Sequence, residues 1–357
     1  NDNLGIIKYL KVLGSGADVV SIGELKRCLK VGINPKNIIF SGVGKEGYEI
    51  EFAILNNIKQ INVESLEELR EVILISKKLQ KLVNVALRVN LDINSKTHKK
   101  ISTGDENSKF GIILSDIFNA YEWMTNAKFI NPYGLAVHVG SQIFDYSVFH
   151  KTYTKIKNLA LDLKKNGFSV NHLDLGGGFG IDYTKNFTLD YNAFEKALNE
   201  VFKDKEFNLS IEPGRSLVAD SGILISRVIR SKSTNLKNFL IVDAAMNNLI
   251  RPTLYNASHK IIPIIKNKKR ELIKYDIVGP ICETGDYLGL DVNLQRMENN
   301  EYLAIMCSGA YGSVMRSNYN SRIDVPEILI HNGKEVVLRN RTNIEKIIDV
   351  DLIPNFN

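Results

Sequence analysis

Strand-like segments alternate with helical segments as far as Glu212 in this chain of 357 residues, and this alternation limits the possible folds more than any other feature. Strands that alternate with helices form a parallel sheet. Seven such units in a row predict a (β/α)8 barrel that lacks one strand, while a doubly wound open sheet is the alternative. The strands are predicted at Ala17–Ser21, Asn37–Ser41, Lys59–Val63, Val83–Asn90, Tyr133–Val139, His172–Leu175 and Asn208–Glu212.

The first strand of such a barrel has no counterpart in this sequence. The chain opens with a predicted helix, Leu4–Leu13, that has no strand ahead of it. A barrel therefore predicts that the missing strand lies before Asn1, and that the natural protein continues upstream.

The pattern changes to a mainly β one near Asp220. Two domains are therefore predicted, a barrel over residues 1–220 and a mainly β domain over residues 221–357. Helices are expected in the second domain at Asp243–Leu249 and Ala310–Met315. Its strands are predicted at Gly222–Ile229, Phe239–Val242, Lys274–Val278, Tyr302–Met306, Glu327–Ile330 and Glu335–Leu338.

Charge and composition argue against nucleic-acid and membrane functions. Lys and Arg number 46 against 40 Asp and Glu, and the basic runs Lys77–Lys81, Lys96–Lys100 and Lys266–Arg270 have no aromatic residues among them. Such runs indicate solvated faces rather than a nucleic-acid site. No apolar run approaches the roughly 18 residues that a membrane span needs. The 3 cysteines lie far apart without metal-ligand spacing, which favours a cytoplasmic, reduced protein.

Chemically useful residues follow three neighbouring barrel strands. His138 and Ser141 follow one strand, the run Gly176–Gly180 follows the next, and Glu212–Arg215 follows the last. Active sites of parallel barrels lie at these strand ends, and glycine turns can direct backbone N–H groups at an anion. Each motif alone also fits a plain structural role, such as a tight turn, a core histidine or a paired acid. Their shared position favours a site for a phosphorylated ligand.

Pyridoxal phosphate would explain this set of residues. The glycines and Ser141 would hold the phosphate, and the imidazole of His138 would lie against the ring. The carboxylate of Glu212 would keep a heteroaromatic nitrogen protonated, because a nearby negative charge favours the charged form. A protonated ring is what a pyridoxal phosphate electron sink requires.

The second domain offers further candidates whose roles the residues alone leave open. Cys282 lies beside Glu283 and close to Asp286, so it is either a general acid or base or a chance cysteine in a loop. Arg251 and Tyr255 are four residues apart and either clamp a carboxylate or pin a loop. Tyr311 stands between small residues, where a packed turn is equally possible.

The combination of these motifs resembles the diaminopimelate decarboxylases, pyridoxal-phosphate enzymes of the alanine-racemase-like fold. The similarity extends over nearly the whole chain. The matching segments are Ala17–Ser21, Gly42–Lys45, Val137–Gln142, Leu173–Gly180, Glu212–Arg215, Cys282–Asp286 and Gly309–Gly312.

The resemblance implies removal of carbon dioxide from the D-centre of meso-2,6-diaminopimelate to give L-lysine. It also implies a homodimer that shares its active sites, and a Schiff-base lysine two residues before Asn1. Cys282 is implied to return a proton to the carbon that loses carbon dioxide. The implied cofactor-binding residues are His138, Ser141, Gly178, Glu212, Pro213, Gly214, Arg215 and Tyr311. The implied substrate-binding residues are Arg215, Arg251, Tyr255, Glu283 and Tyr311.

Two alternative functions are weighed against this one. Decarboxylases of ornithine, arginine or carboxynorspermidine share the fold. An enzyme that acts on a substrate with a diamine-type distal end needs acidic residues to bind that end. Arg251 and Tyr255 beside Glu283 instead favour a substrate whose distal end has both a carboxylate and an amine. A pyridoxal-phosphate-binding barrel without catalysis is the other alternative. The Cys282–Asp286 cluster and the whole second domain argue against it.

Overall fold

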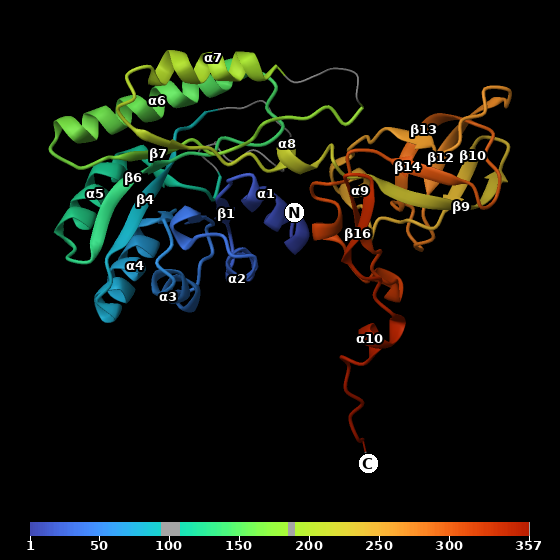
Figure 1. The fold of residues 1–357 in the computed structure, drawn as a ribbon, viewed down its shortest axis with the longest axis horizontal. Helices are drawn as coiled ribbons and strands as arrows, with labels where there is room; N and C mark the ends of the chain where they lie inside the picture. The colour runs from blue at the N-terminus through green and yellow to red at the C-terminus, as the bar shows by residue number, and fades with distance from the viewer. Residues whose placement is uncertain (94–107, 185–189, 357) are drawn as a thin grey trace. The chain divides into compact units, whose positions relative to one another are not determined.

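The computed structural model describes residues 1–93, 108–184 and 190–356 (Figure 1). The basic run at 96–100 therefore lies outside the described residues. The chain divides into two compact units. The first comprises Asp2–Gly180 and Leu189–Gly214, and the second comprises Asn1, Ile181–Thr188 and Arg215–Asn357.

The first unit is built on a curled parallel sheet with its strands in chain order. The order is β1-β2-β3-β4-β6-β7-β8, and β5 pairs with β4. The strands are β1 (Ala17–Val19), β2 (Ile38–Phe40), β3 (Gln60–Val63), β4 (Val83–Asn90), β5 (Ile112–Ile113), β6 (Ile130–Ala136), β7 (His172–Asp174) and β8 (Asn208–Ser210). All these pairings are parallel, and β1 and β8 form the two edges. The predicted barrel class is confirmed.

Helices alternate with these strands along the chain and cover the sheet (Figure 1). They are α1 (Leu4–Val12), α2 (Ile22–Lys30), α3 (Gly47–Leu55), α4 (Leu66–Leu79), α5 (Ile117–Asn126), α6 (Tyr146–Lys165) and α7 (Tyr191–Phe202). Two of them start where the sequence places a serine three residues before a glutamate. Ser21 accepts a hydrogen bond from the Glu24 amide, and Ser65 accepts one from the Glu68 amide. These N-caps satisfy amides that a helix start leaves unpaired.

Aromatic packing fixes the glycine run to the helical layer. The ring of Phe179, inside the run, stacks on Phe149 of α6 with centroids 5.0 Å apart. It also meets Phe194 of α7 edge-on at 4.6 Å. Both Phe149 and Phe179 are buried. The loop that carries the glycines is therefore anchored in the core by its single aromatic residue.

The second unit is mainly β, as predicted. One sheet has the order β11-β14-β9-β10-β12-β13, and β15 and β16 form a separate hairpin. The strands are β9 (Leu224–Ser233), β10 (Asn238–Val242), β11 (Ile261–Pro263), β12 (Leu272–Val278), β13 (Tyr287–Gln295), β14 (Tyr302–Ile305), β15 (Glu327–His331) and β16 (Lys334–Arg339). The helices are α8 (Arg215–Val218), α9 (Arg251–Tyr255) and α10 (Ile344–Ile348).

Two local predictions in this unit differ from the structure. The helix expected at Asp243–Leu249 is wrong, because these residues form a turn. Asp286 accepts from the Met246 amide, which a helix over these residues would bond to its own backbone. The second expected helix, Ala310–Met315, is reduced to a 3-10 turn at Ser313–Met315. Strands β11 and β13 are additional elements that the pattern did not predict.

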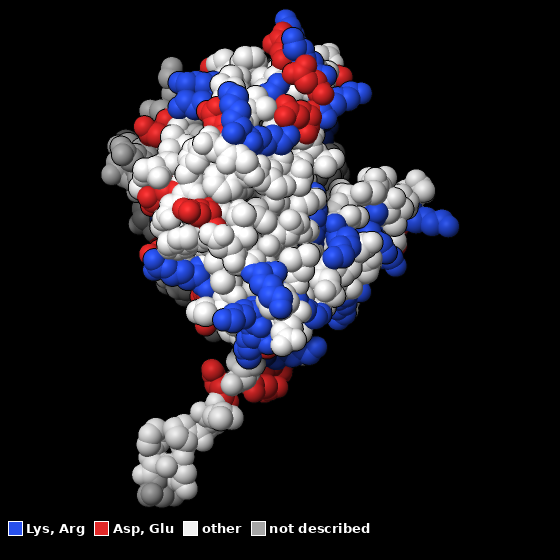
Figure 2. All heavy atoms as spheres, turned by 90° about the vertical axis from the view of Figure 1, so that its left-hand side faces the viewer, with Lys and Arg blue, Asp and Glu red and all other residues white. Residues whose placement is uncertain are grey.

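No helix in the described part of the chain is long and apolar enough to cross a membrane. On the face drawn in Figure 2, Lys and Arg form separate groups around a broad area without charged side chains. This distribution agrees with the prediction that the basic residues belong to solvated faces.

Candidate active site

Hydrogen bonds join the ends of β6, β7 and β8 in the first unit. The Val137 amide donates to the Asp174 carbonyl at 2.9 Å, and the Leu175 amide donates to the Ser210 carbonyl at 2.9 Å. The Glu212 amide then donates to the Gly176 carbonyl at 2.8 Å. The three segments predicted to carry chemistry are thus brought together at one end of the sheet.

The glycine run lies too close to its neighbours to admit side chains. A Cβ at Gly177 would lie 2.1 Å from the Glu212 carbonyl oxygen, and one at Gly178 would lie 2.4 Å from the Gly140 carbonyl oxygen. Gly178 also has a φ of +98°, which favours glycine. Among the described residues, the amides of Gly178 and Gly214 have no hydrogen-bond acceptor. They are donors that an anionic group can use.

His138 is held as a neutral ring beside the glycines. Its Nδ1 accepts a hydrogen bond from the Gly177 amide at 3.2 Å, so its proton lies on Nε2. Burial lowers the pKa of His138 to about 4, and the nearby positive charge of Arg88 contributes to the shift. At neutral pH the residue is therefore a flat, uncharged ring, which suits contact with an aromatic ligand.

Acidic groups are in excess around Glu212. Desolvation raises the pKa of Glu212 well above its ordinary value, and the negative charges of Asp174 and Asp18 raise it further. The residue is half-buried. Arg88 is a cation near this group, and it pairs with Glu64 at 2.8 Å. A ligand with a protonated ring nitrogen would relieve this repulsion, because an opposite charge stabilises the ionised carboxylate.

Polar side chains fix the other two acids of this group. Asn62 donates from its Nδ2 to Asp174 Oδ2 and to Ser41 Oγ, both at 3.0 Å. Ser41 in turn donates to Asp18 Oδ1 at 2.7 Å. Asp18, Asp174 and Asn62 were not predicted as parts of the site. The signal that was available is their position in three strands of one parallel sheet.

Two lysine amines in the first unit are already engaged. Lys45 pairs with Glu68 at 2.7 Å, and its side chain is fully buried. Lys59 donates to Ser210 Oγ at 2.8 Å. Both amines therefore have partners of their own, and the Schiff-base lysine ahead of Asn1 stays a prediction.

The second unit gathers two buried guanidinium groups around Tyr183. Arg215 donates from Nη1 to the Tyr183 hydroxyl at 2.6 Å, and the Arg251 guanidinium lies 3.9 Å from the Tyr183 ring centroid. The Arg215 guanidinium also lies 4.6 Å from the centroid of Tyr311, whose side chain is exposed. Tyr255 lies on α9 together with Arg251. Two cations converge here, and no acidic side chain pairs with Arg251 among the described residues. That these residues bind a carboxylate stays a prediction.

The Cys282 loop is shaped by Asp286. The Asp286 carboxylate accepts the amides of Met246 and Ile281, each at 2.7 Å, so its role is structural. Cys282 and Glu283 remain exposed on the loop. Cys282 Sγ lies 3.6 Å from Asn320 Oδ1, and Glu283 accepts a hydrogen bond from the Tyr319 hydroxyl. Tyr319 and Asn320 were not predicted, since nothing in their sequence spacing links them to this loop.

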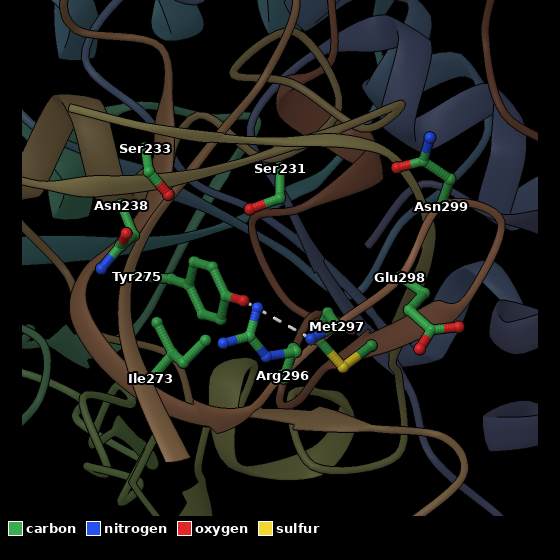
Figure 3. A pocket seen from close by; sticks show the side chains of 9 residues that line it. All are labelled: Ser231, Ser233, Asn238, Ile273, Tyr275, Arg296, Met297, Glu298 and Asn299. Atoms are coloured by element: carbon green, nitrogen blue, oxygen red, sulfur yellow. Dashed lines mark hydrogen bonds between the residues drawn. The ribbon is translucent and has the colours of Figure 1, made fainter. Parts of the chain in front are cut away.

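A separate hollow of about 360 Å³ lies on the β-sheet of the second unit (Figure 3). It contains none of the predicted residues, and Arg296 at its rim is already paired with Glu271 at 2.7 Å. The hollow is lined by Ser231, Ser233, Asn238, Ile273, Tyr275, Arg296, Met297, Glu298 and Asn299. It has no buried charged group to fix a ligand, so we assign it no function.

A family model described as the pyridoxal binding domain of pyridoxal-dependent decarboxylases matches residues 1–219. A diaminopimelate decarboxylase of Aquifex aeolicus is 41% identical over 99% of this chain and 84% of that protein. One of Neisseria meningitidis serogroup A is 42% identical over 97% of this chain and 85% of that protein. The crystal structure of Helicobacter pylori diaminopimelate decarboxylase complexed with L-lysine has a TM-score of 0.94 and 38% identity, and covers 98% of this chain and 87% of that one.

The barrel and its glycine cradle are those of a pyridoxal-dependent decarboxylase. Similarity over nearly its full length goes further: the chain belongs to the family of diaminopimelate decarboxylases. Its cofactor is pyridoxal 5′-phosphate. The first unit fits this group, because it offers free amides for a phosphate, a neutral imidazole for a ring, and a carboxylate for a ring nitrogen.

Substitution of Gly177 by Ala tests the cradle. The new Cβ would meet the Glu212 carbonyl and force β7 and β8 apart at their ends. We expect the free energy of unfolding to fall by about 1–3 kcal/mol, and pyridoxal phosphate binding, followed by absorbance, to weaken at least tenfold. Gly44→Ala is the control, because a Cβ there meets nothing within 4 Å. Equal cofactor affinity of the two variants would contradict the assignment.

Proposed function

We propose that this protein removes carbon dioxide from the D-centre of meso-2,6-diaminopimelate and yields L-lysine. The observation that carries this proposal is the buried pair Arg215 and Arg251, which suits a substrate whose unreacting end has a carboxylate. Family membership supports the same reaction, and two crystal structures of Helicobacter pylori relatives are complexes with L-lysine. Decarboxylases of diamine-type substrates need acids where this chain has arginines.

Residues of the first unit bind and tune the cofactor in this proposal. Bound pyridoxal phosphate supplies the electron sink that a decarboxylation requires. Gly178, Gly214 and Ser141 hold its phosphate, and His138 lies against its ring. Glu212 holds a proton at the ring nitrogen, and Asp174 and Asp18 around it make a positively charged partner favourable.

Residues of the second unit bind the substrate and move a proton. Arg215, Arg251 and Tyr255 take the distal carboxylate, and Glu283 takes the distal amine. Tyr311 contacts cofactor and substrate. The bond between the D-centre and its carboxylate breaks, the electron pair stays with carbon, and Cys282 delivers a proton to that carbon.

Carbon dioxide release from three candidate substrates tests the reaction. The full-length protein with pyridoxal phosphate should release carbon dioxide from meso-diaminopimelate, and at least a hundredfold more slowly from L-ornithine or L-arginine, because these have no distal carboxylate for the two arginines. Release from ornithine or arginine alone would assign the chain to the related decarboxylases. Release from none would favour a binding protein without catalysis.

The Cys282→Ala variant tests the proton donor. The thiol is exposed and bound only to Asn320 among the described residues, so its removal should leave folding and cofactor absorbance unchanged. Turnover of meso-diaminopimelate should fall about 10²-fold or more, the usual contribution of a positioned acid. Asn320→Ala is a matched control that changes the thiol's neighbour and keeps the thiol. Unchanged turnover in Cys282→Ala would refute the assigned role.

We also propose that the enzyme works as a homodimer in the cytoplasm. None of the three cysteines forms a disulfide in the described part of the chain, as expected in a reducing compartment. The isolated hairpin β15–β16 exposes Ile328, Ile330 and Val337 by 55%, 65% and 59%. Hairpins of this kind are marginal alone, and a partner subunit that covers them would explain their apolar surface. Activity that sediments with membranes would contradict the location.

Analytical ultracentrifugation tests the dimer. The protein should sediment as a dimer, and Ile330→Glu should shift it toward monomer because a charge on this apolar surface opposes burial. Ile265→Glu is the control, at a position of the same unit that is 77% exposed and lies outside the hairpin. A wild-type monomer, or a dimer equally stable in both variants, would contradict the assignment of the interface to the hairpin.

A further inference from the structure

His259 is held between a guanidinium and a backbone carbonyl in the second unit. Its Nδ1 lies 2.8 Å from the Met306 carbonyl oxygen, and its Nε2 lies 2.7 Å from Arg251 Nη1. Because a carbonyl can only accept, Nδ1 carries the proton. The lone pair of Nε2 therefore accepts from Arg251. Both His259 and Arg251 are buried, at 6% and 4% exposure.

Packing completes this arrangement. The His259 ring meets the Tyr183 ring at 4.8 Å in an edge geometry, while the Arg251 guanidinium lies 3.9 Å from the centroid of the same ring. The guanidinium is thus fixed by a ring beside it and by one hydrogen bond at Nη1. Within the described residues, its buried Nε has no hydrogen-bond partner. The edge formed by Nε and Nη2 can bind a carboxylate in bidentate fashion while Nη1 keeps its bond to His259.

We propose that His259 is a positioning residue that holds Arg251 through Nη1 and so presents its Nε–Nη2 edge to the distal carboxylate of the substrate. This inference rests on the proposed function, which makes that end a carboxylate. The neutral state of His259 is essential, because an imidazolium has no lone pair to offer. Burial and the charges of Arg251 and Arg215 favour that state and lower the pKa of His259 to about 4, while the hydrogen bond to Met306 opposes the shift.

Calorimetric binding of L-lysine and of cadaverine measures this role directly. L-Lysine carries the carboxylate of the distal end, and cadaverine is the same molecule without it. His259→Phe keeps a flat ring against Tyr183 but removes the acceptor. We expect it to weaken L-lysine binding about tenfold or more and to leave cadaverine binding unchanged. The KM for meso-diaminopimelate should rise by a similar factor, while kcat changes less than threefold.

The glutamine variant separates positioning from a general structural role. His259→Gln retains an acceptor oxygen, so its preference for L-lysine over cadaverine should return to within about threefold of the wild type. His150→Leu, at an exposed histidine on α6, should leave both affinities unchanged. If His259→Phe does not fold, the comparison of His259→Gln with His259→Leu gives the same contrast.

Three results would overturn the inference. They are unchanged L-lysine binding in His259→Phe, equal weakening of L-lysine and cadaverine, and a His259→Gln variant as impaired as His259→Phe. If the proposed function is wrong, a different set of results is expected. In that case the wild type would release no carbon dioxide from meso-diaminopimelate, while the calorimetric comparison would still report on whether His259 directs Arg251 toward a carboxylate.

Discussion

Close backbone contact between the ends of β7 and β8 is the constraint on which the rest of the first unit depends. Gly177 lies so near the Glu212 carbonyl that a methyl group would not fit. This contact allows the Glu212 amide to reach the Gly176 carbonyl, and it allows the Gly177 amide to reach His138. The missing side chain at Gly177 thus lets the backbone hold both the His138 imidazole and the Glu212 main chain beside the glycine run. The stacking of Phe179 on Phe149 then ties this loop to the core.

The two units carry opposite electrostatic character at their candidate sites. In the first unit, Glu212 is surrounded by further acids, and the cation Arg88 is neutralised by Glu64. In the second unit, Arg215 and Arg251 converge on one tyrosine, and Arg251 has a neutral histidine as its hydrogen-bond partner. Burying like charges is costly unless a ligand compensates. A cofactor with a cationic ring nitrogen and a substrate with an anionic end would compensate both, which agrees with the chemistry of a diaminopimelate decarboxylase.

Much of the fold could be predicted because its signals are local. Periodic apolar segments placed most strands of the first unit within a few residues, and β4 matches its predicted bounds. Predictions failed where a side chain far away in the sequence determines the backbone conformation. The segment Asp243–Leu249 has a helical pattern, but Asp286 takes up the Met246 amide from forty residues away along the chain. Strand β13 pairs with β12 in an irregular register that no local pattern reveals.

The sequence by itself determined the fold class, the cofactor chemistry and the positions of His138, the glycines and Glu212, because strand ends in a parallel barrel share one edge. It left the roles of Arg251 and Cys282 open. Only the tertiary structure brought Tyr183 between the two arginines and set His259 behind one of them. It also showed that Asp286 supports a loop, whereas the adjacent Cys282 is exposed. These distinctions depend on hydrogen bonds between residues far apart in the chain, which residue spacing cannot specify.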